Sequence, residues 1–333
     1  MKILINCPSN FNISQESIKK GGGIETLNYD LAIFLSKQKM KIFISSICKK
    51  SIKKSNILNI PIESIKKNSQ RYKFDAIISS NDSCIFNYFP NSKKLLWMHN
   101  KLQIEKSIRK KQLFSIFRNK PIVIFVSKYL KDATSKIYPF KKRYVIPNFL
   151  PSDFISNANS YKRNPIFVWS VQREKGLNDT IDMWINNIYT KSKRAKFYIL
   201  GINKLKQKYT IKFLKSKNIF FIGRVSKKKL KKIYEKSTAM ICLGYDETFC
   251  LNALEANSCG LPVLTFGKSA LNELILNNYN GFVVNNFKDL SIKILSFLKL
   301  NALEQQKFRD NALIFSKKYH LSNVIYKWLK LLK

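Results

Sequence analysis

The stretch AMICLGYDETFCLNALEANSCGLPVLTF, residues 239–266, predicts a strand, a loop, a helix and a second strand in that order. The helix is expected over about 249–258, and Gly260 ends it before the next strand opens. This βαβ unit holds two glutamates, Glu247 and Glu255, with seven residues between them. The pattern favours a parallel sheet covered by helices.

The positions of the two glutamates indicate a binding site. Glu247 follows a strand, and open parallel sheets bind ligands outside the carboxyl ends of their strands. The helix that begins after Glu247 offers free amides to a phosphate. At helical rise Glu255 lies about 12 Å further along, which is too far for a glycosidase acid/base pair but suits the two ends of one elongated ligand. The alternative is a solvated loop acid at Glu247 and a purely structural Glu255.

The rest of the chain repeats the alternation of strands and helices, which predicts an α/β protein with two doubly wound domains facing a cleft. Strand-like runs occupy the N-terminal half, a polar connector follows near 152–164, and the alternation then restarts with PIFVWS. We expect an N-terminal domain over 1–152, a C-terminal domain over 153–315, and a terminal helix over 316–333 that packs toward the first domain.

Composition excludes several classes of protein. The 333 residues are 45% hydrophobic, which is typical of globular domains, and no apolar run is long enough to span a bilayer. The start, MKILINCPSN, resembles a buried strand and not a secretory signal. Six scattered cysteines predict reduced thiols in the cytoplasm, and with two histidines a His-rich zinc site is not expected.

The net charge of +41 is spread evenly along the chain. The first 160 residues carry 29 basic and 9 acidic residues, and the remainder carries 32 and 11. Nucleic-acid readers concentrate their charge on one face and rely on arginine, whereas lysine dominates here. We therefore expect no specific nucleic-acid partner. The lysine excess reflects either A/T-rich codon usage or attraction to an anionic lipid or substrate.

The stretch from Glu247 to Glu255, followed by CGLPV, closely resembles the E-x7-E signature of retaining glycosyltransferases of the GT-B fold, glycosyltransferase family 4. In that family the first glutamate contacts the hydroxyls of the donor sugar and the second holds the ribose of the nucleotide. The resemblance implies that backbone amides of the intervening residues face the sugar and the diphosphate. These are Thr248, Phe249, Cys250 and Leu251.

The resemblance covers nearly the whole chain. The run KKGGGIETLNYDLAIFL is similar to the family's first glycine-rich loop, which places Gly22 and Gly23 near the diphosphate. WMHN is similar to its histidine motif, which places His99 beside the donor sugar and the acceptor. FFIGRVSKKKLKKIYEKSTAMICLG resembles the segment that receives the nucleobase, with Gly223, Arg224 and Val225 in its loop.

One stretch departs from the family pattern. In FVWSVQREKGLNDTIDMW the resemblance assigns Lys175 to the diphosphate, but Ser170 stands where the family usually has an arginine. Arg173 lies nearby and is the candidate to replace that arginine. The alternative is a solvated turn.

These features together predict a metal-independent glycosyltransferase that transfers a hexose, with retention, from a nucleotide diphosphate sugar to a saccharide or lipid-linked acceptor. The resemblance implies cell-envelope polysaccharide or lipopolysaccharide synthesis, with no cofactor and no metal, since D-x-D is missing. Catalysis is assigned to Glu247, His99, Lys175 and Arg173. The alternatives are a sugar-nucleotide epimerase of the same architecture and a basic nucleic-acid-binding protein. The donor base, the hexose and the acceptor are left open.

The segment KLQIEKSIRKKQLFSIFRNK, residues 101–120, predicts a basic amphipathic helix. Helical spacing sets four apolar residues near one side: Ile104, Ile108, Phe114 and Phe117. Basic residues surround them: Lys106, Arg109, Lys110, Lys111 and Arg118. We expect docking on an anionic membrane surface, which makes the protein cytoplasmic and peripheral on the inner face of the cytoplasmic membrane. The alternative is a helix that packs its apolar side on the core.

Overall fold

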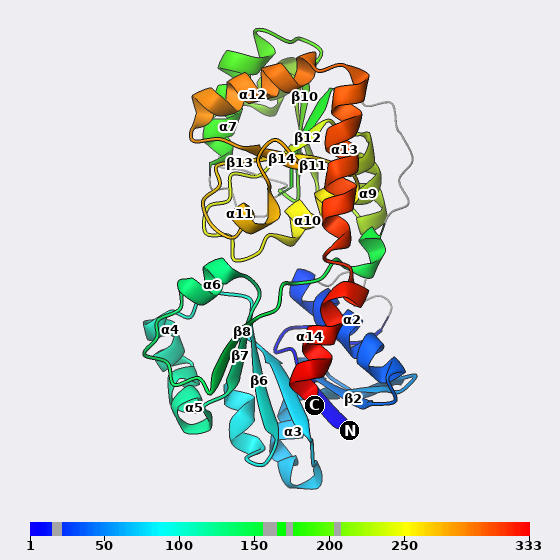
Figure 1. Ribbon diagram of the computed structural model, residues 1–333, viewed down its shortest axis with the longest axis vertical. Helices are drawn as coiled ribbons and strands as arrows, with labels where there is room; N and C mark the ends of the chain where they lie inside the picture. Colours follow the sequence, from blue (N-terminus) through cyan, green and yellow to red (C-terminus); the bar gives the residue numbers. More distant parts are fainter. Residues whose placement is uncertain (15–21, 156–164, 171–175, 203–207) are drawn as a thin grey trace. The chain divides into compact units, whose positions relative to one another are not determined.

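The computed structural model describes residues 1–14, 22–155, 165–170, 176–202 and 208–333 (Figure 1). The chain divides into two compact units, one of 1–151 with 324–333 and the other of 152–323. Each described unit is a parallel α/β sheet flanked by helices, as the alternation of strands and helices predicts.

Within the described residues, the sheet of the first unit has eight strands in the order β3-β4-β2-β1-β5-β6-β7-β8. The strands are β1 (Lys2–Asn6), β2 (Lys41–Ser46), β3 (Ile52–Lys54), β4 (Ile57–Pro61), β5 (Ala76–Ser80), β6 (Lys93–Met98), β7 (Ile122–Phe125) and β8 (Lys142–Val145). All pairs are parallel except the short edge pair β3 and β4. The central strands are buried on both faces, which explains their continuous apolar runs.

The helices of this unit are α2 (Gly23–Lys37), α3 (Ile62–Lys67), α4 (Ile104–Arg109), α5 (Gln112–Asn119), α6 (Lys128–Asp132) and most of α14 (Leu321–Leu332), with short 3-10 turns η1 (Ser69–Arg71) and η2 (Cys84–Tyr88). Trp328 of α14 packs edge-on against Trp97 of β6, with ring centroids 4.8 Å apart. Both indole side chains are fully buried. This contact explains why the last ten residues group with the first unit, whereas the predicted terminal segment begins at 316.

The sheet of the second unit has six described strands in the order β11-β10-β9-β12-β13-β14, all parallel. They are β9 (Ile166–Trp169), β10 (Lys196–Leu200), β11 (Ile219–Gly223), β12 (Ala239–Ile241), β13 (Val263–Thr265) and β14 (Gly281–Val283). The helices are α7 (Leu177–Met183), α8 (Ile211–Ser216), α9 (Lys227–Lys236), α10 (Leu251–Ser258), α11 (Leu271–Leu274), α12 (Phe287–Lys299) and α13 (Ala302–Lys317), with η3 (Ser152–Phe154) and the π-helical η4 (Trp184–Tyr189).

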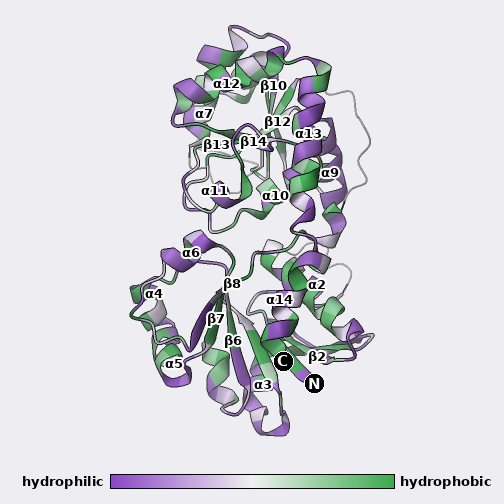
Figure 2. Cartoon of the chain, in the orientation of Figure 1, coloured by the Kyte–Doolittle hydropathy of each residue, from purple (hydrophilic) through white to green (hydrophobic). Residues whose placement is uncertain are grey.

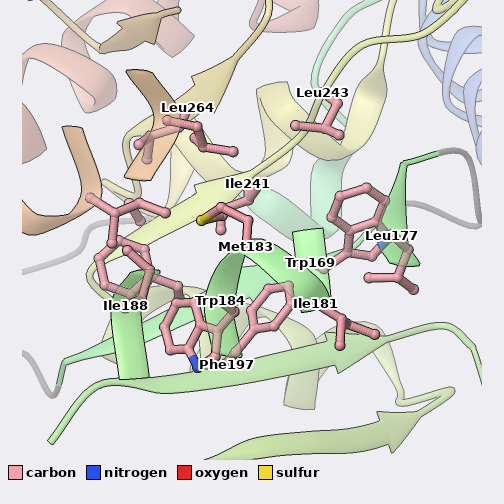
Figure 3. Packing of buried hydrophobic residues seen from close by; sticks show 14 of the residues in the cluster. Trp169, Leu177, Ile181, Met183, Trp184, Ile188, Phe197, Ile241, Leu243 and Leu264 are labelled. Carbon is pink, nitrogen blue, oxygen red and sulfur yellow. The ribbon is translucent and has the colours of Figure 1, made fainter. Parts of the chain in front are cut away.

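The core of the second unit forms where α7 and η4 cover the sheet (Figure 3). Trp184 stacks on Phe197 of β10 at 5.0 Å and meets Phe167 of β9 edge-on at 5.7 Å. These side chains are fully buried and anchor β9 and β10 beneath the helical layer. The rigid sheet in turn fixes the carboxyl ends of β9 and β12, where the polar loops begin.

Candidate active site

The loop 242–250 connects β12 to α10 at the carboxyl end of the strand. Three of its residues take left-handed backbone conformations, Gly244, Asp246 and Cys250, with φ of 81°, 57° and 69°. These conformations turn the chain sharply back toward the helix. The carbonyl of Glu247 accepts a hydrogen bond from the amide of Ala270 at 3.1 Å. The half-exposed Glu247 is therefore held at the position that the sequence predicts for it.

This loop stands at the point where the strand order of the second sheet reverses. From β9 the chain adds β10 and β11 on one side and β12 to β14 on the other. Ser170 directly follows β9, and its carbonyl accepts a hydrogen bond from the side-chain amide of Asn252 in the first turn of α10. Doubly wound sheets bind their ligands at such a switch point. The expectation of a ligand site at this edge thus agrees with the topology.

The helix α10 begins at Leu251, and Cys250 is its N-cap. We predicted a start at about Phe249, so Phe249 belongs to the loop and Cys250 to the cap instead. The left-handed Cys250 is the physical reason, because a helix cannot continue through such a residue. Phe249 packs edge-on against Tyr319 at 5.9 Å. In the first turn of α10 the amides of Ala253 and Leu254 donate to the carbonyl of Cys250, at 3.2 and 3.4 Å. Amides at a helix N-terminus suit an anion, because the first of them have no acceptor within the helix.

The later helix start also changes the spacing of the two glutamates. The predicted separation of about 12 Å assumes helical rise over all eight steps. Only the four steps from Leu251 to Glu255 are helical, and these account for about 6 Å. The remaining residues belong to the folded-back loop, so the helical estimate for the whole span is wrong.

The carboxyl group of Glu255 is buried in α10, with 8% of the residue exposed. Burial raises the pKa of Glu255 to about 8, Lys227 opposes this shift, and Asp153 adds to it. Lys227 Nζ lies 3.0 Å from Asp153 Oδ2 and forms a salt bridge with that carboxylate, so Lys227 compensates the burial of Glu255 only in part. Burying a carboxyl group costs free energy, which a purely structural role does not explain. A ligand that brings hydroxyl groups to Glu255 would recover part of that cost.

The predicted diphosphate residues Lys175 and Arg173 lie outside the described residues. Gly176, which follows them, is described and has a φ of 81°. A Cβ atom at this position would lie 2.6 Å from Leu243 and 2.9 Å from Tyr245, both in the loop that carries Glu247. Glycine is therefore required here by both conformation and space.

The predicted nucleobase residues lie between β11 and α9. Gly223 ends β11 with a φ of 70°, Arg224 is exposed and Val225 is half-buried. Ser226 then caps α9, because its hydroxyl accepts a hydrogen bond from the amide of Lys229 at 3.3 Å. These three residues thus follow a strand at the carboxyl edge of the second sheet.

The first unit has a polar pocket at the switch point of its own sheet, between β1 and β5. The cavity measures about 420 Å³. Its polar lining combines carboxylates, amides, hydroxyls and lysines, namely Ser9, Glu25, Lys66, Ser80, Asn81, Asp82, Lys110 and Gln112. Groups of these kinds suit a ligand with several hydroxyl groups.

His99 lies just after β6 and is buried, with 5% exposed. Burial lowers the pKa of His99 to about 3, so its imidazole is neutral at physiological pH. The ring packs against Trp97 at 4.5 Å, and the backbone amide donates to Asn81 Oδ1 at 2.7 Å. Asn81 also lines the pocket, so the structure ties His99 to the wall of that cavity.

Gly22 and Gly23 begin α2, with Gly22 as its N-cap. The backbone amide and the hydroxyl of Thr26 both donate to the carbonyl of Gly22, at 3.1 and 3.0 Å. Gly22 and Gly23 thus directly precede Ile24 and Glu25, which line the pocket of the first unit.

Our sequence reasoning missed the pocket residues Glu25, Asn81, Asp82 and Gln112. The available signal was the polar run NDS directly after the buried strand β5. Asp82 accepts from the amide of Cys84 at 2.9 Å, and Asn81 has a φ of 56°, so the run forms a tight turn. Glu25 and Gln112 gave no such signal, because only the fold brings them to the pocket.

None of the described helices combines the length and the hydropathy that crossing a bilayer demands. In the same part of the chain, His, Cys, Asp and Glu side chains do not gather in groups of three that could hold a metal ion.

Comparison with known proteins finds a family match within the second unit. Residues 151–313 match the model of the family Glycosyl transferases group 1. An uncharacterized glycosyltransferase of Methanocaldococcus jannaschii is 26% identical over 223 residues, which are 66% of this chain and 61% of that protein. The alpha-galactosylglucosyldiacylglycerol synthase of Streptococcus pneumoniae is 23% identical over 245 residues, which are 67% of this chain and 64% of that protein. The chain thus matches less than two thirds of the length of each relative.

Solved structures extend the likeness to the whole chain. The Anabaena protein HepE, solved in complex with UDP and glucose, superimposes with a TM-score of 0.69 and 14% identity, over 100% of this chain and 99% of that one. At this identity the likeness shows the fold alone. The chain has the GT-B fold, and its second unit carries the sequence pattern of the glycosyl transferases group 1.

Proposed function

We propose that the protein is a retaining glycosyltransferase that moves a hexose from a nucleoside diphosphate sugar to a saccharide or lipid-linked acceptor. The observation that carries this proposal is the unit β12–loop–α10 at the switch point of the second sheet, with Glu247 in the loop and the Glu255 carboxyl buried in the helix. The family match over 151–313 supports the same reading.

The donor is proposed to bind along this unit. Glu255 receives the ribose hydroxyls, and Glu247 orients the hydroxyls of the hexose. The amides around the start of α10 face the diphosphate, where the positive end of the helix dipole favours negative charge. The base occupies the turn formed by Gly223, Arg224 and Val225. HepE was solved with UDP and with glucose, which supports a ligand of this class.

Cleavage of the donor leaves a second negative charge on the terminal phosphate of the nucleoside diphosphate. Fixed positive groups stabilise that charge most effectively when they are in place before the reaction. We assign this work to the amides of the α10 turn, to Lys175 and to Arg173, and therefore expect transfer without a metal ion. His99 is proposed to contact the sugar as a neutral hydrogen-bonding group, because burial keeps its pKa near 3.

The acceptor is proposed to bind in the pocket of the first unit. Glu25 and Asp82 offer carboxylates to hydroxyl groups of a saccharide, while Asn81 and Gln112 offer amides. Lys66 and Lys110 add positive charge at the same cavity, which suits an acceptor that carries a phosphate or a carboxylate. Synthesis of cell-envelope polysaccharide or lipopolysaccharide supplies acceptors of this kind, and we place the reaction at the inner face of the cytoplasmic membrane.

The division of labour between the two glutamates provides the test. Calorimetric titration with UDP, GDP and ADP first identifies the base. Glu255→Ala is then expected to weaken binding of that nucleotide about tenfold or more, because the ribose hydroxyls lose their hydrogen-bonding partner in a buried site. Glu247→Ala is expected to leave nucleotide binding nearly intact and to cut turnover at least about a hundredfold, since it orients the reacting sugar.

Glu235→Ala, on α9 of the same unit, serves as a matched control and is expected to change neither quantity. Equal losses of nucleotide affinity in Glu247→Ala and Glu255→Ala would show that the assignment is wrong. The absence of binding to all three nucleotides would overturn the proposed function itself.

A further inference from the structure

The helices α4 and α5 turn their large apolar side chains toward solvent. Ile104 and Ile108 of α4 are 54% and 47% exposed, and Phe114 and Phe117 of α5 are 67% and 50% exposed. Within each helix the pair is spaced by four or three residues, so both members lie on the same side. Figure 1 locates both helices in the first unit, and Figure 2 shows hydrophobic and hydrophilic residues side by side along α5.

The inner side of α5 is held by a polar contact and by one buried apolar side chain. Ser107 and Ser115 are buried, while Ile116 is the one fully buried apolar residue among the described positions of α5. Ser115 Oγ donates to the carbonyl of Ser83 at 2.6 Å. The alternative in which the four apolar side chains pack on the core is therefore wrong. This arrangement leaves apolar area in water, which is typical of a surface that meets another apolar phase.

The surroundings of this apolar surface are strongly basic. The segment 101–120 contains a single acid, Glu105, and seven basic residues, all of which are exposed. The basic residues are Lys101, Lys106, Arg109, Lys110, Lys111, Arg118 and Lys120. The exposed phenylalanine and isoleucine side chains of α4 and α5 are thus surrounded by basic residues.

We propose that the surface formed by α4 and α5 docks on an anionic lipid bilayer. A second copy of the same surface is a poor partner, because a two-fold contact would bring the two basic fields together. A nucleic acid would neutralise the lysines but leave the phenylalanines in water. A bilayer with anionic headgroups satisfies both features, because the rings enter the headgroup boundary while the lysines and arginines meet phosphates.

The docking surface adjoins the polar pocket of the first unit. Lys110 and Gln112, at the junction of the two helices, line that cavity. The carbonyl of Lys110 also accepts from the thiol of Cys84 in η2 at 3.3 Å, and Gln112 Nε2 donates to the carbonyl of Asn81 at 3.0 Å. A bilayer on α4 and α5 would therefore place lipid headgroups beside the pocket. The docking proposal itself stands without the proposed function, since its test measures binding alone.

Co-sedimentation of the full chain with vesicles tests the proposal. One set of vesicles contains phosphatidylcholine alone, and the other contains equal parts of phosphatidylcholine and phosphatidylglycerol. We expect at least about tenfold stronger partitioning to the anionic vesicles, because several basic residues each contribute near the surface. Raising the salt concentration is expected to reduce this preference through screening.

Two double variants separate the apolar and the electrostatic contributions. Phe114→Ser with Phe117→Ser is expected to weaken partitioning about tenfold, since two rings no longer enter the bilayer. Lys106→Glu with Arg118→Glu is expected to weaken partitioning to anionic vesicles by a similar factor and to leave neutral vesicles unaffected. All four side chains are exposed, so thermal melting of each variant is expected to match that of the parent.

The matched control is Ile292→Ser with Leu303→Ser, which removes two side chains of the second unit that are 56% and 83% exposed. It is expected to leave vesicle binding unchanged. Equal partitioning to neutral and anionic vesicles overturns the proposal, and so does unchanged binding by the phenylalanine variant. A dimer in analytical ultracentrifugation that the phenylalanine variant abolishes would assign the surface to a second copy instead and would equally overturn it.

Discussion

Replacing Glu255 by glutamine tests whether the buried carboxyl is held in the fold at a cost in stability. Burial raises its pKa from 4.5 to about 8. One pKa unit corresponds to about 1.4 kcal/mol, so ionising Glu255 within the folded chain costs up to about 5 kcal/mol. Glutamine has almost the same shape and never ionises. Its own buried amide costs about 1–3 kcal/mol when it lacks partners, which leaves a net gain of about 2–4 kcal/mol at high pH.

The sign of the pH dependence follows from proton binding. The unfolded chain releases the Glu255 proton near pH 4.5, whereas the folded chain retains it up to about pH 8. Between these values the folded state binds more protons, so stability falls as the pH rises and then levels off. Below about pH 4.5 both states are protonated, and the penalty is absent. The advantage of the glutamine variant therefore develops between about pH 4.5 and pH 8.

Thermal melting of the parent and Glu255→Gln at about pH 5 and about pH 8.5 provides the measurement. We expect the variant to melt about 5 to 10 °C above the parent at the higher pH, with a small difference at the lower pH. Asp310→Asn, an exposed change in the same unit, is the control and is expected to show no such growth. An unchanged difference between the two pH values would refute the reasoning from burial.

Two further predictions concern Gly176, which packs against the loop 242–250, and the need for a metal ion. Gly176→Ala is expected to destabilise the second unit by about 2 kcal/mol or more and to lower turnover, because the new Cβ would clash with Leu243 and Tyr245 at a φ of 81°. Urea unfolding measures the change in stability, and a variant as stable as the parent would contradict this prediction. Hexose transfer is expected to survive excess EDTA, since Lys175, Arg173 and the amides of α10 supply the positive charge. Loss of activity on chelation, with recovery on addition of magnesium or manganese, would contradict this prediction.

The sequence is sufficient to predict the α/β class of both units, because strands buried on both faces appear as continuous apolar runs separated by amphipathic helices. It places Glu247 correctly after β12, since Gly244 and the polar residues that follow interrupt the apolar run. The start of α10 was predicted too early. Its boundary depends on the left-handed Cys250, and a cysteine carries no local signal for that conformation.

The polar pocket of the first unit is harder to predict from the sequence. Its lining comes from segments far apart in the chain, among them Ser9, Glu25, Asp82 and Gln112. Each is an ordinary polar residue in its local context. Only the parallel pairing of β1 with β5 brings the ends of these segments together. Long-range strand pairing is a property of the whole sheet, so spacing along the chain does not reveal it.

The outward-facing side chains of α4 and α5 show a different limit. Helical spacing predicts one helix over 101–120, which is wrong, because the left-handed Lys111 separates α4 from α5. It correctly predicts that Phe114 and Phe117 share a side, but it predicts equally well that this side faces the core. The structure shows which side faces inward: the hydroxyl of Ser115 donates to the carbonyl of Ser83, so Ser115 lies on the inner side of α5. Because that serine occupies the place where a core-packed helix would have an apolar residue, the phenylalanines lie on the exposed side of α5. A periodic pattern therefore identifies the apolar side of a helix, whereas the partners of its polar side determine which way it faces.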